Sequence, residues 1–312
     1  MKIVDFHIHL WKEEFLTNEF KKMLNNFAMM LDKEEFPVVD SSPEKYLELI
    51  EPKKDVQKKF PINQAIIYPI DYTFTNVKFK ISYEDYLEFV VRTCDEHKGF
   101  FYSLVGPDPR HGSKALEIID NALGQEPFKG LILTPSTGFS LDDPLVDKMV
   151  QKAGEYKVPV VIHDPALVPP PLELFTEFKK LEQLISRFME QLFIICPFSQ
   201  MDQLLMRAVI RHRNHIMVDN TGYDSQYIGQ KIPDMFFAQF FAMLKETFGS
   251  QRIIFGSDWP WWEATVPIQK WLTYVRKMKL PIFLSPFGLP TLKKKDKENI
   301  LGLNAQRILN LP

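Results

Sequence analysis

Eight short apolar runs, rich in β-branched and aromatic residues, recur along almost the whole 312-residue chain. Amphipathic stretches with helical spacing separate most of them, as in residues 83–97, 113–123, 145–156 and 235–248. Strands that alternate with helices indicate parallel β-α-β units, and eight such units in this length predict a (β/α)8 barrel of the TIM type. A doubly wound sheet is the alternative, but no Gly-x-Gly-x-x-Gly turn follows the first run. The eight runs cover residues 2–9, 64–70, 100–106, 129–134, 158–163, 192–196, 215–220 and 252–258.

The segment between the first two predicted strands is longer than one barrel helix requires. It contains stretches with helical spacing, so we expect residues 12–60 to form a small helical cap above the first strand. A second insertion, residues 164–171, contains three successive prolines, and the chain beyond residue 280 has the pattern of a terminal helical extension. We therefore expect one domain over residues 1–312, with the cap inserted in it.

Composition narrows the class of protein. A net charge of −2 without a basic stripe argues against nucleic-acid binding. No apolar run reaches the roughly 18 residues of a membrane-spanning helix. The chain has two cysteines, Cys94 and Cys196, too few for a disulfide framework, and its first residues lack a signal-peptide pattern. We expect a cytoplasmic protein that acts on a small molecule, without nucleic-acid or membrane partners.

His7 and His9 lie one residue apart at the end of the first apolar run. Alternate residues of a strand face the same side, so both imidazoles should point into the barrel, with Asp5 on the same side and one step deeper. Two imidazoles at this spacing can hold one ion from one side. The alternative is a pair of core or surface histidines, and taken alone the pair leaves both interpretations open.

Two further candidates close other predicted strands. His163 ends the fifth run and Asp258 ends the eighth. Taken singly, His163 fits a loop or helix-capping role and Asp258 fits a helix N-cap. Together with His7 and His9 they place three histidines and one carboxylate at the carboxyl ends of strands one, five and eight. Such a set suits one divalent ion, with zinc as the first choice and a position left for water.

Zinc lowers the pKa of a bound water to about 7, which makes hydroxide available at neutral pH. In that arrangement Asp258 could bind the ion weakly and take a proton from the water. Trp11, Tyr68 and Trp259 lie at or just beyond predicted strand ends, where they could wall a substrate pocket. Aromatic packing between the loops and the cap explains them equally well.

The chain resembles the amidohydrolase superfamily, in its amidohydrolase-related branch, over nearly its whole length. The resemblance rests on Asp-Phe-His-Ile-His at residues 5–9, on the strand that ends in His163, on Gly-Ser-Asp-Trp-Pro at residues 256–260 and on Asn-Ala-x-Arg-x-Leu at residues 304–309. It implies a metal set of His7, His9, His163 and Asp258, and a homodimer, because members of the branch often pair. The branch contains sugar-lactone and pyrone lactonases, hydratases and non-oxidative decarboxylases such as aminocarboxymuconate semialdehyde decarboxylase. Residues 9–11 and 256–260 are similar to the lactonases in particular.

Two strands depart from the family pattern. Predicted strand four, residues 129–134, is apolar at its centre and lacks the bridging lysine or glutamate of two-metal members, which argues for one ion. It also argues against a nuclease of the Tat-associated deoxyribonuclease type. Predicted strand six lacks the usual histidine, and Cys196, Ser199 or Gln200 could occupy that position. Neither a thiol nor an amide replaces a histidine as a proton carrier.

These observations predict a metal-dependent hydrolase that opens a lactone, ester or amide bond through a metal-bound hydroxide. A decarboxylase or hydratase of the same family is the first alternative. A decarboxylase needs a basic residue to anchor the substrate carboxylate, and none is evident at a predicted strand end. Arg110 and Lys129 are the nearest candidates. The missing strand-six histidine supports a second alternative, a barrel that binds a ligand and has lost catalysis.

Overall fold

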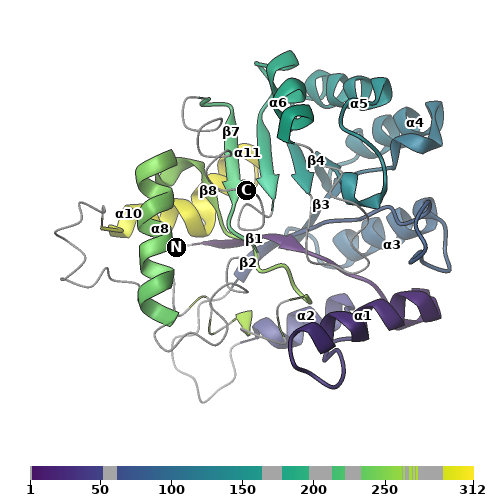
Figure 1. Ribbon diagram of the computed structural model, residues 1–312, viewed down its shortest axis with the longest axis horizontal. Helices are drawn as coiled ribbons and strands as arrows, with labels where there is room; N and C mark the ends of the chain where they lie inside the picture. The colour runs from purple at the N-terminus through teal and green to yellow at the C-terminus, as the bar shows by residue number, and fades with distance from the viewer. Residues whose placement is uncertain are drawn as a thin grey trace.

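The computed structural model of the chain describes residues 2–51, 62–163, 178–196, 213–221, 233–261, 263, 267, 268, 270, 272 and 291–312. Its centre is one sheet of eight parallel strands in sequence order, so each strand pairs with its neighbours in the chain (Figure 1). The strands are β1 (Ile3–Ile8), β2 (Ile62–Ile67), β3 (Phe101–Val105), β4 (Phe128–Leu133), β5 (Val160–His163), β6 (Phe193–Cys196), β7 (Ile216–Asp219) and β8 (Ile253–Ile254).

The first and last strands close this sheet into a barrel. The backbone N–H of Phe6 donates to the carbonyl of Phe255, and the N–H of His9 donates to the carbonyl of Trp259. Together with the helices that follow most strands, this closure makes the fold a (β/α)8 barrel of the TIM type, as predicted.

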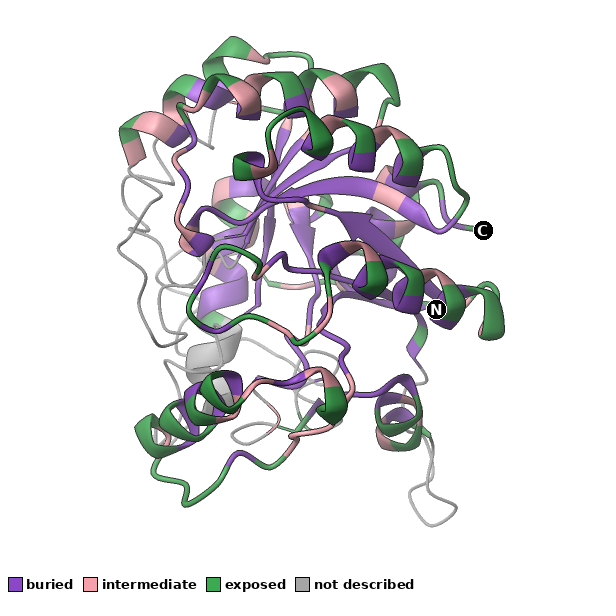
Figure 2. Ribbon diagram, turned by 90° about the vertical axis from the view of Figure 1, so that its right-hand side faces the viewer, coloured by how far each residue is buried: buried purple, intermediate pink, exposed green. Residues whose placement is uncertain are grey.

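Helices surround the strands and bury only one side each, as Figure 2 shows. They begin where the chain offers caps: α3, for example, starts after Ser82, whose side chain forms a reciprocal capping box with Asp85. The helices are α1 (Asn18–Met30), α2 (Pro43–Ile50), α3 (Tyr83–Glu96), α4 (Ser113–Leu123), α5 (Pro144–Glu155), α6 (Phe178–Arg187), α8 (Pro233–Phe248), α10 (Lys294–Glu298) and α11 (Asn304–Leu309). Among the described residues, none of the helices has the length and apolar character needed to cross a membrane.

The strands separate two apolar layers. On β5, Val161 belongs to the core inside the barrel, whereas Val160 and Ile162 pack in the layer between strands and helices. The alternation continues to the end of the strand, so His163 faces inward. The inner core contains Val4, Phe6, Ile66, Tyr102, Leu104, Ile132, Val161, Ile194, Met217 and Ile254.

A β-bulge in β1 overturns one expectation. Asp5 pairs with Ala65 and Ile8 pairs with Ile67, so three steps along β1 match two along β2. The extra residue breaks the alternation, and Asp5 does not share the inward face of His7. Its carboxylate instead accepts hydrogen bonds from the Tyr46 hydroxyl of α2 and the Ser257 N–H, both at 2.8 Å. Asp5 therefore ties β1 to the α2 helix and to the segment after β8.

Helices α1 and α2 lie between β1 and β2 in the chain, where the cap was expected, and below the barrel strands in Figure 1. The apolar side chains of α1 form a separate core with Trp11 and Trp261, whereas Tyr46 and Ile50 of α2 belong to the main core between strands and helices. The assignment of residues 1–312 to one domain, with residues 12–60 as its insertion, stays a prediction. The proline-rich insertion at residues 164–171 lies outside the described residues.

The carboxyl-terminal helix closes the opposite end of the barrel. The Asn304 amide donates to the carbonyls of Ser250 and Ile253, both at 2.8 Å, and Arg307 donates to the carbonyl of Gln251. These bonds hold α11 at the start of β8. The Asn-Ala-x-Arg-x-Leu motif thus lies at the end of the barrel opposite to the strand ends that carry the histidines.

Glu263 gives the fold a pH dependence. Its carboxylate is largely buried and accepts a hydrogen bond from the Ile268 N–H, and burial raises its pKa from 4.5 to about 7. Because the folded pKa lies above the unfolded one, the stability contributed by protonated Glu263 is complete below pH 4.5 and is lost as the pH rises through about 7.

We expect the free energy of unfolding of Glu263→Gln, relative to that of the wild type, to be about 1–2 kcal/mol higher at about pH 8 than at about pH 5. This figure allows for partial exposure of the side chain. Urea unfolding of metal-free protein at both pH values measures this gain. The Glu35→Gln variant, which removes an exposed carboxylate, is the control. A Glu263→Gln variant that follows the wild type at both pH values contradicts the assignment.

Candidate metal centre

Three side chains meet at the carboxyl-terminal end of the barrel. His7 and His9 come from the end of β1, and Asp258 follows β8. The two Nε2 atoms lie 3.0 Å apart, and Asp258 Oδ1 lies 3.4 Å from His7 Nε2 and 3.2 Å from His9 Nε2. All three residues are buried, and one ligand atom from each lies within 4.8 Å of the others. This is the spacing of ligands around one ion.

Hydrogen-bond partners determine which ring nitrogens carry protons. His9 Nδ1 lies 3.2 Å from the carbonyl oxygen of Tyr68, which can only accept, so this nitrogen carries a proton. His7 Nδ1 lies 3.1 Å from a carboxylate oxygen of Asp219 and is protonated for the same reason. In the neutral rings, both Nε2 atoms then present lone pairs to each other and to Asp258. Three electron-pair donors repel one another unless a cation or an additional proton lies between them.

The pKa values of the pair follow from this arrangement. Burial alone would lower the pKa of His7, but the charges of Asp258 and Asp219 outweigh it and raise that pKa above 6.5. Burial dominates for His9, whose pKa is lowered. Without a cation, the pair can therefore take up one proton, on His7, in the position that an ion would occupy.

His163 completes the histidine set from β5. Its ring centroid lies 4.9 Å from that of His7 and 5.5 Å from that of His9. Its Nδ1 is buried and has no hydrogen-bond partner within the described part of the chain, which is costly for a polar atom and leaves it available to a ligand. Burial and the two neighbouring histidines hold the pKa of His163 well below its usual value, so the ring is neutral.

The backbone after β8 places Asp258 beside the histidines. Asp258 has a φ of 55°, in the left-handed region that aspartate tolerates better than most residues. Its N–H donates to the carbonyl of His7 at 2.9 Å, and its carbonyl accepts from the N–H of Trp261 at 2.8 Å. These bonds fix the carboxylate against β1.

Asp219, the last residue of β7, and Thr221, two residues further on, were not predicted from the sequence as parts of the site. Asp219 is buried and orients His7 through the contact between Oδ2 and Nδ1. Its Oδ1 accepts hydrogen bonds from the N–H and the hydroxyl of Thr221, at 2.8 and 2.5 Å. A carboxylate that holds the outer nitrogen of a ligating histidine sets its tautomer and raises its basicity. The available signal was the place of Asp219 as the last inward residue of an apolar strand.

Gly256 makes the close approach between β8 and His7 possible. A Cβ atom at this position would lie 2.5 Å from His7 Cβ and 2.5 Å from Thr221 Oγ1. Neither neighbour can move without disturbing the histidine, so the Gly-Ser-Asp sequence needs its glycine for a steric reason.

The structure places Cys196 next to His7 and level with His163, its partner in the β5–β6 register. Its Sγ lies 3.0 Å from His7 Nδ1 and 3.1 Å from Asp219 Oδ2. Burial and Asp219 raise the pKa of this thiol. Cys196 is thus the described residue at the end of strand six, and the alternatives Ser199 and Gln200 lie outside the described residues.

Tyr68 lies against the centre. Its ring stacks on His7 with centroids 3.9 Å apart, and its hydroxyl is buried without a hydrogen-bond partner in the parts of the chain that the structure describes. Burial raises its pKa well above 10, so the phenol stays neutral and can donate a hydrogen bond.

The two tryptophans proposed for substrate binding lie in packed surroundings. Trp11 packs against Phe20 and donates from Nε1 to the carbonyl of Val39 at 2.8 Å. Trp259 packs against Tyr46, with ring centroids 5.2 Å apart. These contacts match the packing alternative, and the substrate-binding role of both tryptophans stays a prediction.

The two basic residues considered as substrate anchors are engaged elsewhere. Arg110 donates from Nε and Nη2 to the carboxylate of Asp108, at 2.8 and 2.7 Å. Lys129 lies at the start of β4, at the other end of the barrel, and pairs with Glu126. Neither can neutralise a substrate carboxylate at this centre without losing its present partner.

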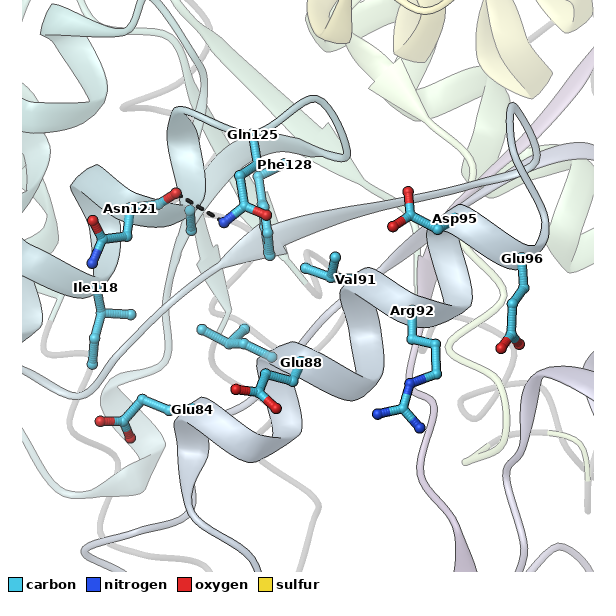
Figure 3. Close-up of a pocket in the computed structure, with 12 residues that line it drawn as sticks. Glu84, Glu88, Val91, Arg92, Asp95, Glu96, Ile118, Asn121, Gln125 and Phe128 are labelled. Carbon is cyan, nitrogen blue, oxygen red and sulfur yellow. Dashed lines mark hydrogen bonds between the residues drawn. The ribbon is translucent and has the colours of Figure 1, made fainter.

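A groove of about 620 Å³ lies on the outside of the barrel, between α3 and α4. Figure 3 shows the acidic residues Glu84, Glu88 and Asp95 along α3, with Arg92 beside them. None of the ligand candidates lines this groove, so it is separate from the candidate metal centre.

Comparisons with known proteins agree with this fold. The chain is similar in structure to a zinc-bound amidohydrolase from Burkholderia multivorans, with 13% identity, full coverage of both chains and a TM-score of 0.70. A probable 2-pyrone-4,6-dicarboxylic acid hydrolase from Acinetobacter baumannii shares 12% identity over 99% of this chain and 100% of that one, with a TM-score of 0.61. A manganese-bound 5-carboxyvanillate decarboxylase from Novosphingobium aromaticivorans shares 12% over 99% and 97%, with a TM-score of 0.60. A search of curated protein sequences found no match.

The sequence profile of the amidohydrolase family matches residues 4–311, almost the whole chain. The solved structures similar to this chain include hydrolases and decarboxylases, so the comparison does not choose between these reactions. The match confirms the resemblance inferred from the motifs, and the chain belongs to the amidohydrolase family.

Proposed function

We propose that the protein is a metal-dependent hydrolase that opens a lactone, ester or amide bond of a small molecule. One observation carries the proposal: His7 Nε2, His9 Nε2 and Asp258 Oδ1 converge within 3.4 Å, with the protons of both rings directed elsewhere. The unpartnered Nδ1 of His163 adds a fourth donor nearby. Three nitrogens and one carboxylate fit one divalent ion, and this nitrogen-rich set favours zinc.

An ion held by His7, His9, His163 and Asp258 would activate a water and polarise the substrate carbonyl. Asp258 is the carboxylate at this point and would accept the proton of the attacking water. The neutral Tyr68 hydroxyl has no hydrogen-bond partner among the described residues and can donate to a substrate oxygen. Opening a lactone ring makes small demands on an acid, because the released alkoxide can take its proton late. A reaction with little need for an acid suits this barrel, because β6 ends in Cys196 and not in the histidine usual for the family.

A decarboxylase is the second candidate, supported by the similarity to 5-carboxyvanillate decarboxylase. Its substrate would carry a carboxylate, and the ion pair between Arg110 and Asp108 occupies the arginine that could have received it. This observation favours hydrolysis. Release of CO₂ from aromatic acids, measured beside ring opening of lactones, distinguishes the two reactions.

The first experiment measures metal in purified protein. We expect about one zinc per wild-type chain and almost none in the His7→Ala/His9→Ala double variant, since it loses two of four ligands. His97→Ala, at the carboxyl-terminal end of α3, is the control and should retain the metal. Equally low metal in the wild type and the double variant, after growth with added zinc, excludes the proposed centre.

A panel of lactones then tests the reaction, with ring opening followed by proton release. Turnover by the metal-loaded wild type supports the hydrolase. If loaded protein binds lactones without turning them over, the ligand-binding barrel is the better description.

A further inference from the structure

We propose that Cys196 supplies a thiolate ligand to the ion at the candidate metal centre. The inference rests on the proposed metal-dependent function and extends it, because no sulfur belongs to the ligand set that the motifs imply. If it is correct, the chain replaces the missing strand-six histidine with a soft ligand.

The position of Cys196 supports this role. Its side chain is fully buried at the last position of β6, directly opposite His163 in the strand register. One ligand atom from each of His7, His163 and Cys196 lies within 4.8 Å of the other two. This second group shares His7 with the group of His7, His9 and Asp258, so the two groups of candidate ligands adjoin at one imidazole ring.

His163 provides independent support. Its ring is buried and packs edge-on against His7, and no described residue forms a hydrogen bond with its Nδ1. A buried imidazole nitrogen without a partner indicates a missing ligand, and the sulfur is the neighbour of His163 in the strand register.

The hydrogen bonds exclude the usual alternative, a nucleophilic cysteine. Such a thiol needs a histidine that accepts its proton on one nitrogen while an acid holds the other nitrogen. Here Cys196 and Asp219 both lie at the same nitrogen of His7, Nδ1. Because that nitrogen carries a proton directed at Asp219, it cannot serve as the base. The thiol instead donates to Asp219 Oδ2.

Ligation involves one bond exchange. The S–H bond breaks, a sulfur–metal bond forms, and the proton passes to Asp219, which already accepts it as a hydrogen bond, and then to solvent. No oxidant or reductant is required. A thiolate among imidazoles selects borderline and soft ions such as zinc and cobalt over manganese and magnesium.

Cobalt titration of the metal-free full-length chain tests the proposal, because a thiolate bound to Co²⁺ produces a near-ultraviolet charge-transfer band. We expect this band in the wild type and in the Cys94→Ser control, which removes the only other cysteine, a buried residue of α3. We expect Cys196→Ser to bind cobalt without the band. X-ray absorption of the zinc-loaded wild type should show one sulfur at about 2.3 Å, and this measurement needs no variant to fold.

The possible results separate the two proposals. Stoichiometric cobalt without the band, or zinc without sulfur in its shell, overturns the role of Cys196 and leaves the histidine centre intact. A wild type that binds neither cobalt nor zinc overturns the metal centre as a whole. A band that persists in Cys196→Ser and disappears in Cys94→Ser assigns the ligand sulfur to Cys94 and also overturns the inference.

Discussion

Replacing Asp258 by asparagine should lower kcat by about 10²–10⁴-fold on a hydrolysed substrate, the usual contribution of a general base. Asparagine has the same shape, tolerates the left-handed backbone at this position and preserves the bonds of the main chain to His7 and Trp261. It loses the charge and the ability to accept a proton. We expect the three histidines to retain most of the metal, so the loss should appear in turnover rather than in metal content.

The test compares kcat and bound metal in the wild type and Asp258→Asn. Asp32→Asn is a matched control, because Asp32 also has a φ of 55° but lies on the exposed surface after α1. The control should keep wild-type activity. A loaded Asp258→Asn enzyme with unchanged kcat removes Asp258 as the base, and turnover that disappears only in this variant removes the ligand-binding alternative.

The barrel could be predicted because each strand is recognisable from its own short apolar run in the sequence. The run at residues 158–163 contains β5 (Val160–His163), and the run at residues 192–196 contains β6 (Phe193–Cys196). Parallel strands of a barrel all end at the same rim, so knowing which residues end strands is enough to bring distant side chains together. That rule placed His7, His163 and Asp258 on one end before any contact was known.

Features that depend on pairing between strands could not be predicted in this way. The β1 bulge exists because three residue steps along β1 pair with only two along β2. Nothing in the sequence of β1 alone indicates that Asp5 points away from His7. The surroundings of Trp11 depend on how the cap folds over it. The roles of Gly256 and Asp219 require β7, β8 and β1 to be adjacent in the closed barrel, a property of the whole sheet.

Asp219 illustrates how such a residue can control the centre without being a ligand. Its carboxylate can only accept from His7 Nδ1, so it keeps the other nitrogen, Nε2, free of a proton. An asparagine at this position can direct its NH₂ group at Nδ1 while its oxygen still accepts from Thr221. His7 would then carry its proton on Nε2, facing His9 and Asp258, where it opposes a cation.

We therefore expect Asp219→Asn to weaken zinc binding by about 10–100-fold, the usual effect of losing such a support. The stability of the metal-free protein should change less than after Asp108→Asn, a buried control that breaks the ion pair with Arg110 away from the centre. Zinc competition measures the affinity, and ¹⁵N-edited imidazole spectra of metal-free protein report the proton on Nε2 directly. A residue that merely fills space would leave the tautomer of His7 unchanged. Wild-type affinity in Asp219→Asn, with the proton still on Nδ1, would show that the convergence of His7 and His9 on an ion does not depend on this carboxylate.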